Sequence, residues 1–117
     1  MNKQHTLKKN SDFRRLYSKG SSSVNPYLVV YCRKNGMKYN RVGFTVSAKL
    51  GNAVTRNRIR RQLREIYRLH LYELKNGKDI VVVARSRCVR GEYHKMDTSF
   101  ITACRELDLL ERNQHLI

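Results

Sequence analysis

Residues 49–68 read KLGNAVTRNRIRRQLREIYR, and this segment decides the fold that we expect. At about 100° per residue, the apolar side chains of Ile59, Leu63 and Ile66 fall on one face, which predicts an amphipathic helix. Periodic apolar residues continue this pattern, so we expect the helix to cover residues 52–74. An amphipathic helix needs an apolar partner, and the flanking segments indicate that this partner is a sheet.

Those flanking segments complete an α/β sandwich. In chain order we expect a helix at 11–19, strands at 27–34 and 41–47, the long helix, a strand at 79–85 and a helix at 94–110. The strand at 79–85 contains the unbroken apolar run Ile-Val-Val-Val-Ala at 80–84, which predicts cover on both of its faces. Asn35-Gly36 predicts a hairpin between the first two strands. The predicted fold class is therefore α/β (α+β), a two-layer sandwich with a small mixed sheet of about four strands and three helices, in one domain over residues 1–117.

The charge of the chain is strongly positive and unevenly distributed. Lys and Arg number 25 against 9 Asp and Glu, which gives a formal net charge of +16. Eighteen of the basic residues but only three of the acidic ones lie at or before Lys75. Six arginines fall within residues 49–68 against one carboxylate, Glu65, although an ordinary solvated helix face mixes both signs. This imbalance favours a polyanion as partner, and the phosphate backbone of nucleic acid is the polyanion that we expect.

The arginines of the long helix occupy the arc beside its apolar face. Asn57 lies among them, whereas Arg58 points elsewhere. The planar guanidinium fork donates two parallel hydrogen bonds to phosphate, and an asparagine can bond a base edge or a 2′-hydroxyl. The alternative is a solvated helix whose arginine stems only cover apolar surface. The lack of compensating acids favours contact with nucleic acid.

Aromatic side chains predict a second nucleic-acid surface. Phe13 and Tyr17 lie one turn apart on the first helix, and Tyr31 projects from the strand at 27–34. Together they can form a cleft in which unpaired bases stack, and unpaired bases favour single-stranded RNA over a duplex. The alternative is that Phe13 belongs only to the core.

Several other classes of protein are disfavoured by the sequence. Cys32, Cys88 and Cys104 form no Cys-x-x-Cys pair, so we expect neither a zinc site nor disulfides, but a reduced, cytoplasmic protein. No apolar run approaches the ~20 residues of a membrane span, and the N-terminus lacks the apolar region of a signal peptide. Too few carboxylates lie in the basic region for a two-metal nuclease site. A DNA-binding protein is disfavoured because a helix-turn-helix is not indicated. A ribosomal or other structural RNA-binding protein stays open as the alternative function.

One motif is more specific than charge. Residues 49–65 contain Lys-x-Gly-x-Ala-Val-x-Arg-Asn-Arg-x-Arg-Arg-x-x-Arg-Glu, which resembles the RNR motif of the bacterial ribonuclease P protein subunit family. The likeness extends to Leu-Lys-Lys-Asn-x-x-Phe at 7–13, Arg-Val-Gly-Phe-Thr-Val-Ser at 41–47 and the apolar strand that ends in Ala84-Arg85. It therefore covers nearly the whole chain.

The resemblance implies a protein that assists removal of the 5′ leader from precursor tRNA, while an RNA subunit performs the catalysis. It implies two partners, the catalytic RNA and the single-stranded leader, with no membrane and no protein partner. No cofactor or metal is implied on this chain, although the holoenzyme requires Mg²⁺. It also implies a left-handed βαβ crossover, against the usual right-handed rule.

The same resemblance assigns residues to both surfaces and assigns no catalytic residue. Tyr17 departs from the phenylalanine common at its position, which keeps a stacking ring and adds a hydroxyl. The implied leader cleft consists of Phe13, Tyr17, Tyr31 and Arg33. The implied contacts to the RNA subunit are Lys49, Arg56, Asn57, Arg58, Arg60, Arg61, Arg64 and Arg68.

Overall fold

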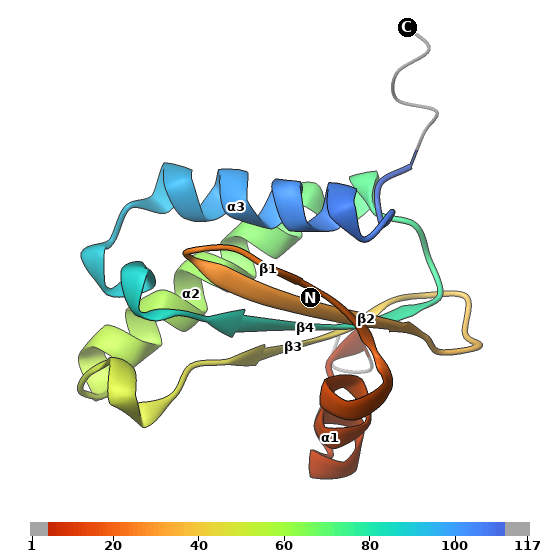
Figure 1. Ribbon diagram of the computed structural model, residues 1–117, viewed down its shortest axis with the longest axis horizontal. Helices are drawn as coiled ribbons and strands as arrows, with labels where there is room; N and C mark the ends of the chain where they lie inside the picture. Colours follow the sequence, from red (N-terminus) through yellow and green to blue (C-terminus); the bar gives the residue numbers. More distant parts are fainter. Residues whose placement is uncertain (1–4, 112–117) are drawn as a thin grey trace, which may run out of the picture.

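Four strands form one mixed sheet, in the order β1-β2-β4-β3, in the computed structural model of the chain (Figure 1). The structure describes residues 5–111, so the ends of the predicted domain, 1–4 and 112–117, lie outside the described residues. In chain order the elements are α1 (Asn10–Lys19), β1 (Ser21–Val24), β2 (Leu28–Lys34), β3 (Arg41–Thr45), the 3₁₀-helix η2 (Ala48–Leu50), α2 (Ala53–His70), η3 (Leu71–Glu73), β4 (Lys78–Ala84), η4 (Ser86–Arg90) and α3 (Tyr93–Glu106). The predicted fold class, an α+β sandwich with three helices on a mixed sheet, is confirmed.

Helices cover both faces of the sheet. Figure 1 shows α2 and α3 on one face and α1 on the other. Ile80 and Val82 of β4 belong to the main core beneath α2 and α3, whereas Val81 packs with Leu7 and Leu16 beside α1. The prediction that the strand at 79–85 is covered on both faces is therefore confirmed.

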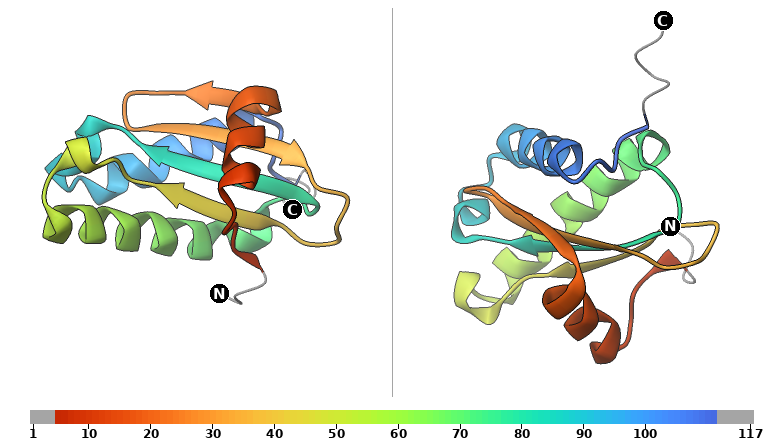
Figure 2. Two further views of the ribbon diagram at one scale, coloured as in Figure 1. Left: turned by 90° about the horizontal axis from the view of Figure 1, so that it is seen from below. Right: turned by 45° about the vertical axis from the view of Figure 1, so that its right-hand side comes forward.

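The crossover from β3 through α2 to β4 is left-handed. The two strands are parallel neighbours, paired from Arg41 with Asp79 to Thr45 with Val83. Viewed from the α1 side (Figure 2, left), both strands run from right to left, β4 lies above β3, and α2 passes behind the sheet. That path advances with a left-handed turn, as the family resemblance implied and against the right-handed preference of about 98% of such crossovers.

The predicted hairpin between the first two long strands is wrong. Asn35 and Gly36 do form a turn, in which Gly36 has a φ of 73° and the Asn35 Oδ1 accepts a hydrogen bond from the Met37 amide at 2.8 Å. However, β4 lies between β2 and β3 and pairs with both. Turn chemistry fixes where a chain reverses, whereas the most apolar strand takes the central place because it needs cover on every side.

Other element boundaries differ from the predicted ones by a few residues. The helix expected to reach 74 ends at His70 and continues as η3, and the helix expected to reach 110 ends at Glu106. The connection between the last strand and the last helix contains η4. The serine-rich segment Ser21–Val24 is the additional strand, which pairs with β2 at the edge of the sheet. The start of α2 is fixed by Asn52, whose Oδ1 accepts a hydrogen bond from the Thr55 amide at 2.9 Å.

A histidine joins the end of α2 to α3. The ring nitrogens of His70 lie 2.5 Å from a Glu73 carboxylate oxygen and 2.6 Å from an Asp97 carboxylate oxygen. Burial disfavours the charged ring, but the hydrogen bonds to the two carboxylates outweigh it and raise the pKa of His70. The His70 ring thus connects three elements, α2, η3 and α3.

We expect this connection to make stability depend on pH. Because the pKa of His70 is raised in the folded chain, its contribution is complete below the unfolded value of about 6.5 and is lost as pH rises past the folded value. Urea unfolding of the wild type and His70→Gln from pH 5.5 to 8.5 measures the difference in free energy. That difference should shrink with rising pH, and His94→Gln, at an exposed position on α3, serves as the control. A difference that stays constant over this range would show that His70 acts only by packing.

Candidate nucleic-acid interface

Helix α2 buries one side and exposes another. Ile59, Leu63 and Ile66 are buried against the sheet and α3, as their spacing predicted. Tyr67 is only 2% exposed because it packs edge-on between Phe44 and Phe100. The side away from the core carries the exposed Asn57, Arg61, Arg64 and Arg68 and the half-buried Arg60.

The exposed arginines of α2 differ in their own partners. Arg68 donates two hydrogen bonds to the Glu65 carboxylate, at 3.1 and 2.7 Å, and this contact lowers the pKa of Glu65. Arg60 donates to the Asn57 side-chain oxygen at 3.2 Å. Arg61 and Arg64 have no hydrogen-bond or ion-pair partner within residues 5–111. These two guanidiniums therefore meet an external anion without first losing an internal contact.

Two other predicted contact residues hold the chain together. The Arg58 Nη2 donates to the carbonyl oxygens of Cys88 and Val89, at 2.9 and 3.0 Å, and so fastens η4 to α2. The Arg56 Nε donates to the Gly51 carbonyl oxygen at 3.1 Å, which ties the start of the helix to the preceding turn. Lys49 is exposed on η2, next to this turn. Arg58 thus lies apart from the exposed arginine side, in agreement with its helical angle.

The predicted aromatic residues come together at the junction of α1 and the sheet. The rings of Tyr17 and Tyr31 meet edge-on with centroids 5.0 Å apart, and those of Phe13 and Tyr17 lie 6.5 Å apart. Tyr17 is 41% exposed, and its hydroxyl forms a 2.8 Å hydrogen bond with the Thr45 hydroxyl on β3. The ring of Phe13 lies on Gly43 so closely that a Cβ there would be 2.5 Å from the ring. Contacts on several sides therefore hold the aromatic group in place.

An open groove of about 470 Å³ links the aromatic group to the arginine helix. Phe13 and Tyr17 line it from α1, Phe44 and Thr45 from β3, and Arg60 from α2. Sequence reasoning missed Phe44 and Thr45 as groove residues, because the strand pattern does not show which strand residues border α1. It also separated Arg60 from the aromatic residues, which the fold brings together.

Arg33 lies in a different hollow from the other predicted cleft residues. This second space, of about 220 Å³, is lined by Arg33 together with Asp12 and Arg15 of α1 and the ion pair between Arg41 and Asp79. The Arg41 guanidinium donates to both carboxylate oxygens of Asp79, at 2.8 and 2.6 Å. Arg33 is therefore on the α1 face of the sheet but outside the aromatic groove.

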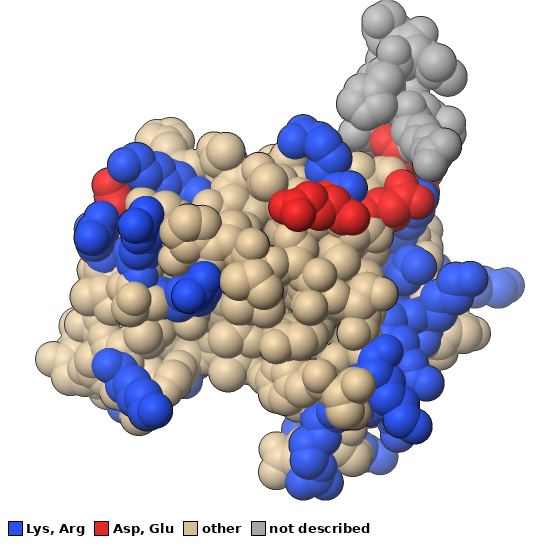
Figure 3. Space-filling model, viewed as in Figure 1, with Lys and Arg blue, Asp and Glu red and all other residues tan. Residues whose placement is uncertain are grey.

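The remaining surface agrees with the uneven charge of the sequence. Lys and Arg side chains gather over α1 and the β2–β3 connection, whereas Asp and Glu gather over the C-terminal half of α3 (Figure 3). Within residues 5–111, no three His, Cys, Asp or Glu side chains are grouped so that they could hold a metal ion. Of the helices described, none is long and apolar enough to span a membrane. Cys32, Cys88 and Cys104 are buried free thiols.

Comparison with known proteins identifies the family. The family model for ribonuclease P matches residues 1–108. The chain belongs to the ribonuclease P protein family. It is 41% identical to the ribonuclease P protein component of Alkaliphilus metalliredigens, over 94% of this chain and 99% of the relative. Proteins of this family are components of ribonuclease P, a tRNA-processing endoribonuclease, so membership implies association with ribonuclease P RNA.

Solved structures of the family agree with the fold. The structure of the Staphylococcus aureus RNase P protein matches with a TM-score of 0.83 and 36% identity, over 92% of this chain and 98% of that one. The RNase P protein from Thermotoga maritima matches with a TM-score of 0.76 and 34% identity, over 83% and 92% of the two chains. The resemblance stated from the RNR motif is confirmed.

We expect the close contact between Gly43 and Phe13 to be essential for the shape of the groove. Gly43→Ala places a methyl group against the Phe13 ring, so the free energy of unfolding should fall by about 1–3 kcal/mol. Urea unfolding of Gly43→Ala, Phe13→Leu and the double variant measures the coupling. A smaller residue at 13 makes room for the methyl group, so the double variant should lose less than the sum of the single losses. If the losses in the free energy of unfolding of the two single variants add up to that of the double variant, the two residues do not share this space.

Proposed function

We propose that α2 binds the RNA subunit of ribonuclease P and that the groove between α1 and β3 takes the single-stranded 5′ leader of precursor tRNA. The observation that carries this proposal is the groove itself, in which the rings of Phe13 and Tyr17 lie beside the Arg60 guanidinium. A single strand needs ring faces for its bases and cations for its phosphates, and this groove offers both. In this proposal the protein assists cleavage by holding the substrate.

The arginine side of α2 supports the proposed contact with structured RNA. Arg61 and Arg64 are exposed without partners within the described part of the chain, and Arg60 and Asn57 lie on the same side. Core packing on the opposite side holds the helix in place, so the arginines project from fixed backbone positions. The full proposed surface comprises Lys49, Arg56, Asn57, Arg58, Arg60, Arg61, Arg64 and Arg68, with Arg58 acting through its hold on η4.

The aromatic groove supports the proposed contact with the leader. Tyr17 offers an exposed ring whose hydroxyl is held by Thr45, while Tyr31 supports it from the sheet. A ring that is already held loses little conformational entropy when a base stacks on it. Arg33 contributes to the proposed leader path from the neighbouring hollow, where its positive charge attracts phosphate.

In this proposal the RNA subunit, and not the protein chain, performs the catalysis. We place Mg²⁺ in the holoenzyme on the RNA subunit and its substrate, and we assign no catalytic residue to this chain. We place the complex in the cytoplasm, where buried thiols such as Cys88 stay reduced. Because stacking tolerates every base, the proposed leader contact does not depend on one particular base.

Arg64→Ala tests the contact with the RNA subunit. Loss of one phosphate contact should weaken binding to refolded ribonuclease P RNA and lower the slope of log affinity against log salt by about 1. Filter binding at several salt concentrations measures both quantities, and Arg105→Ala, at an exposed position on α3, is the matched control. An unchanged slope for Arg64→Ala, with an intact circular dichroism spectrum, would place the RNA subunit on another surface.

Tyr17→Ala tests the leader groove. Loss of one stacking ring should weaken holoenzyme binding to precursor tRNA by about 1–3 kcal/mol and leave binding to mature tRNA, which has no leader, unchanged. Tyr17→Phe keeps the ring and loses only the hydrogen bond to Thr45, so it should bind nearly as the wild type does. Equal weakening for precursor and mature tRNA would contradict the leader assignment.

The protein chain without the RNA subunit should leave precursor tRNA intact in Mg²⁺. Cleavage by that preparation would contradict the proposal that the RNA subunit performs the catalysis.

A further inference from the structure

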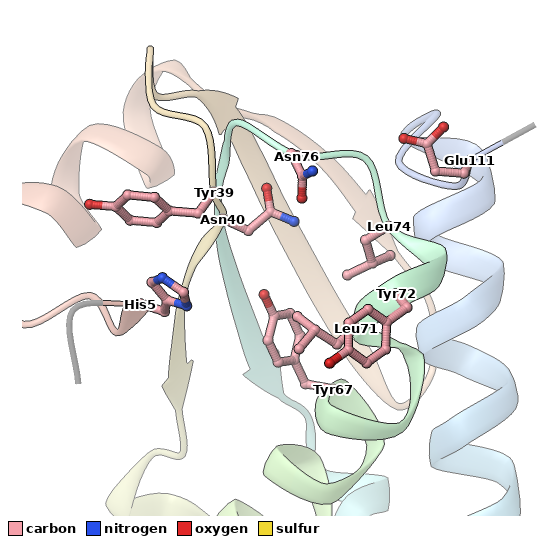
Figure 4. Close-up of a pocket in the computed structure, with 9 residues that line it drawn as sticks. All are labelled: His5, Tyr39, Asn40, Tyr67, Leu71, Tyr72, Leu74, Asn76 and Glu111. Atoms are coloured by element: carbon pink, nitrogen blue, oxygen red, sulfur yellow. The ribbon is translucent and has the colours of Figure 1, made fainter. Parts of the chain in front are cut away.

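A second aromatic hollow lies at the opposite end of α2 from the groove. It has a volume of about 390 Å³ and is bounded by His5, Tyr39, Tyr67 and Tyr72, which come from four separate segments (Figure 4). None of its lining residues is Lys or Arg, although α2 is rich in arginine only one turn away. The function proposed above makes no use of this hollow.

The walls of the hollow are suited to a flat, uncharged group. On one side the rings of His5 and Tyr39 stack with centroids 4.5 Å apart, and across from them Tyr72 is 90% exposed (Figure 4). The rim is fixed by Asn40, whose side chain donates to the Lys75 carbonyl oxygen and accepts from the Lys78 amide, both at 2.8 Å. These two hydrogen bonds hold the Asn40 side of the site in place before any ligand arrives.

The hollow also contains polar groups that can read an edge of a base. Tyr67 is only 2% exposed, and its hydroxyl points from the floor toward His5 and Asn40 (Figure 4). Burial raises the pKa of Tyr67 to about 12, so the hydroxyl keeps its proton and can donate. The Glu111 carboxylate at the rim can accept a hydrogen bond from an exocyclic amino group.

The arginine side of α2 leads directly to this hollow. Leu71, which lines it, is the first residue of η3 and follows Arg64 by seven residues along the same continuous helical segment. Arg60 lines the groove at the end of β3, while Tyr39 and Asn40 line the hollow just before β3 begins. Arg64 is therefore placed between the two sites, on the side where the proposed RNA contact runs.

We propose that the hollow binds one unpaired, amino-bearing base of ribonuclease P RNA while the arginine side of α2 holds the adjacent phosphates. Proteins recognise unpaired bases by stacking them on aromatic rings and bonding their edges, and this hollow offers both. A duplex is excluded because its bases are already stacked, and a lining that has the Glu111 carboxylate but no Lys or Arg disfavours a phosphate. The volume is near the lower end of the usual range for ligand sites, about 300–1,000 Å³, which suits a single base. This inference rests on the proposed contact between α2 and the RNA subunit.

Binding of refolded ribonuclease P RNA to the full chain tests this inference. Tyr72→Ala removes one wall and should weaken binding by about 5- to 150-fold, whereas Tyr72→Phe keeps the ring and should bind as the wild type does. The slope of log affinity against log salt should not change, since no phosphate contact is lost. The matched control is Leu69→Ala, a 53% exposed position in the same turn of the helix that does not line the hollow.

Chemical probing of the bases in the same complexes gives an independent readout. The wild type should protect an unpaired base that Tyr72→Ala leaves reactive, while protections that depend on Arg64 persist. Wild-type affinity and protection for Tyr72→Ala would overturn the inference and leave the arginine contact standing. A lowered salt slope for Tyr72→Ala would also overturn it, because the residue would then act on phosphates. A wild-type chain that fails to bind the RNA would overturn both the inference and the proposed function.

Discussion

The burial of β4 on both faces is the constraint from which the rest of the structure follows. Five of its seven residues are buried, so neither face of the strand can be left to water. Ile80 and Val82 require the layer of α2 and α3, and Val81 requires α1 with Leu7 and Leu16. Each covering helix then keeps one side exposed. The proposed RNA contacts lie on those exposed sides, and the groove lies at the edge of the sheet where α1 and α2 approach the same strand.

The free energies of charge repulsion and of apolar burial explain why α2 tolerates so many like charges. A pair of like charges one turn apart costs about 0.2–0.5 kcal/mol, whereas burial of one large apolar side chain contributes about 1.5–3 kcal/mol. Burial of Ile59, Leu63 and Ile66 therefore contributes more free energy to folding than the repulsion between the arginines costs. Arg58 further reduces the exposed charge by donating to η4. The arginine row is therefore compatible with a folded protein before any RNA binds.

Local patterns in the sequence determined the elements and their faces. Helical spacing was sufficient for the buried side of α2 and for the separate direction of Arg58, because each depends only on residues within a few turns. The continuous apolar run of β4 likewise predicted a strand covered on both faces. Phe13, Tyr17 and Tyr31 were chosen from the sequence and do meet in the structure, since the first two share a helix face. The RNR motif indicated the family because its length and spacing are rarer than basic composition.

Only the tertiary structure decided how these elements combine. Asn35-Gly36 makes a turn, but the partners of β2 and β3 depend on β4, which begins 33 residues after the end of β3. The hand of the crossover contradicts the general steric preference, so the residues alone gave no reason to expect it. The hollow between His5 and Tyr72 joins residues from both ends of the chain. Such sites arise from non-local packing, which a periodic pattern in the sequence does not contain.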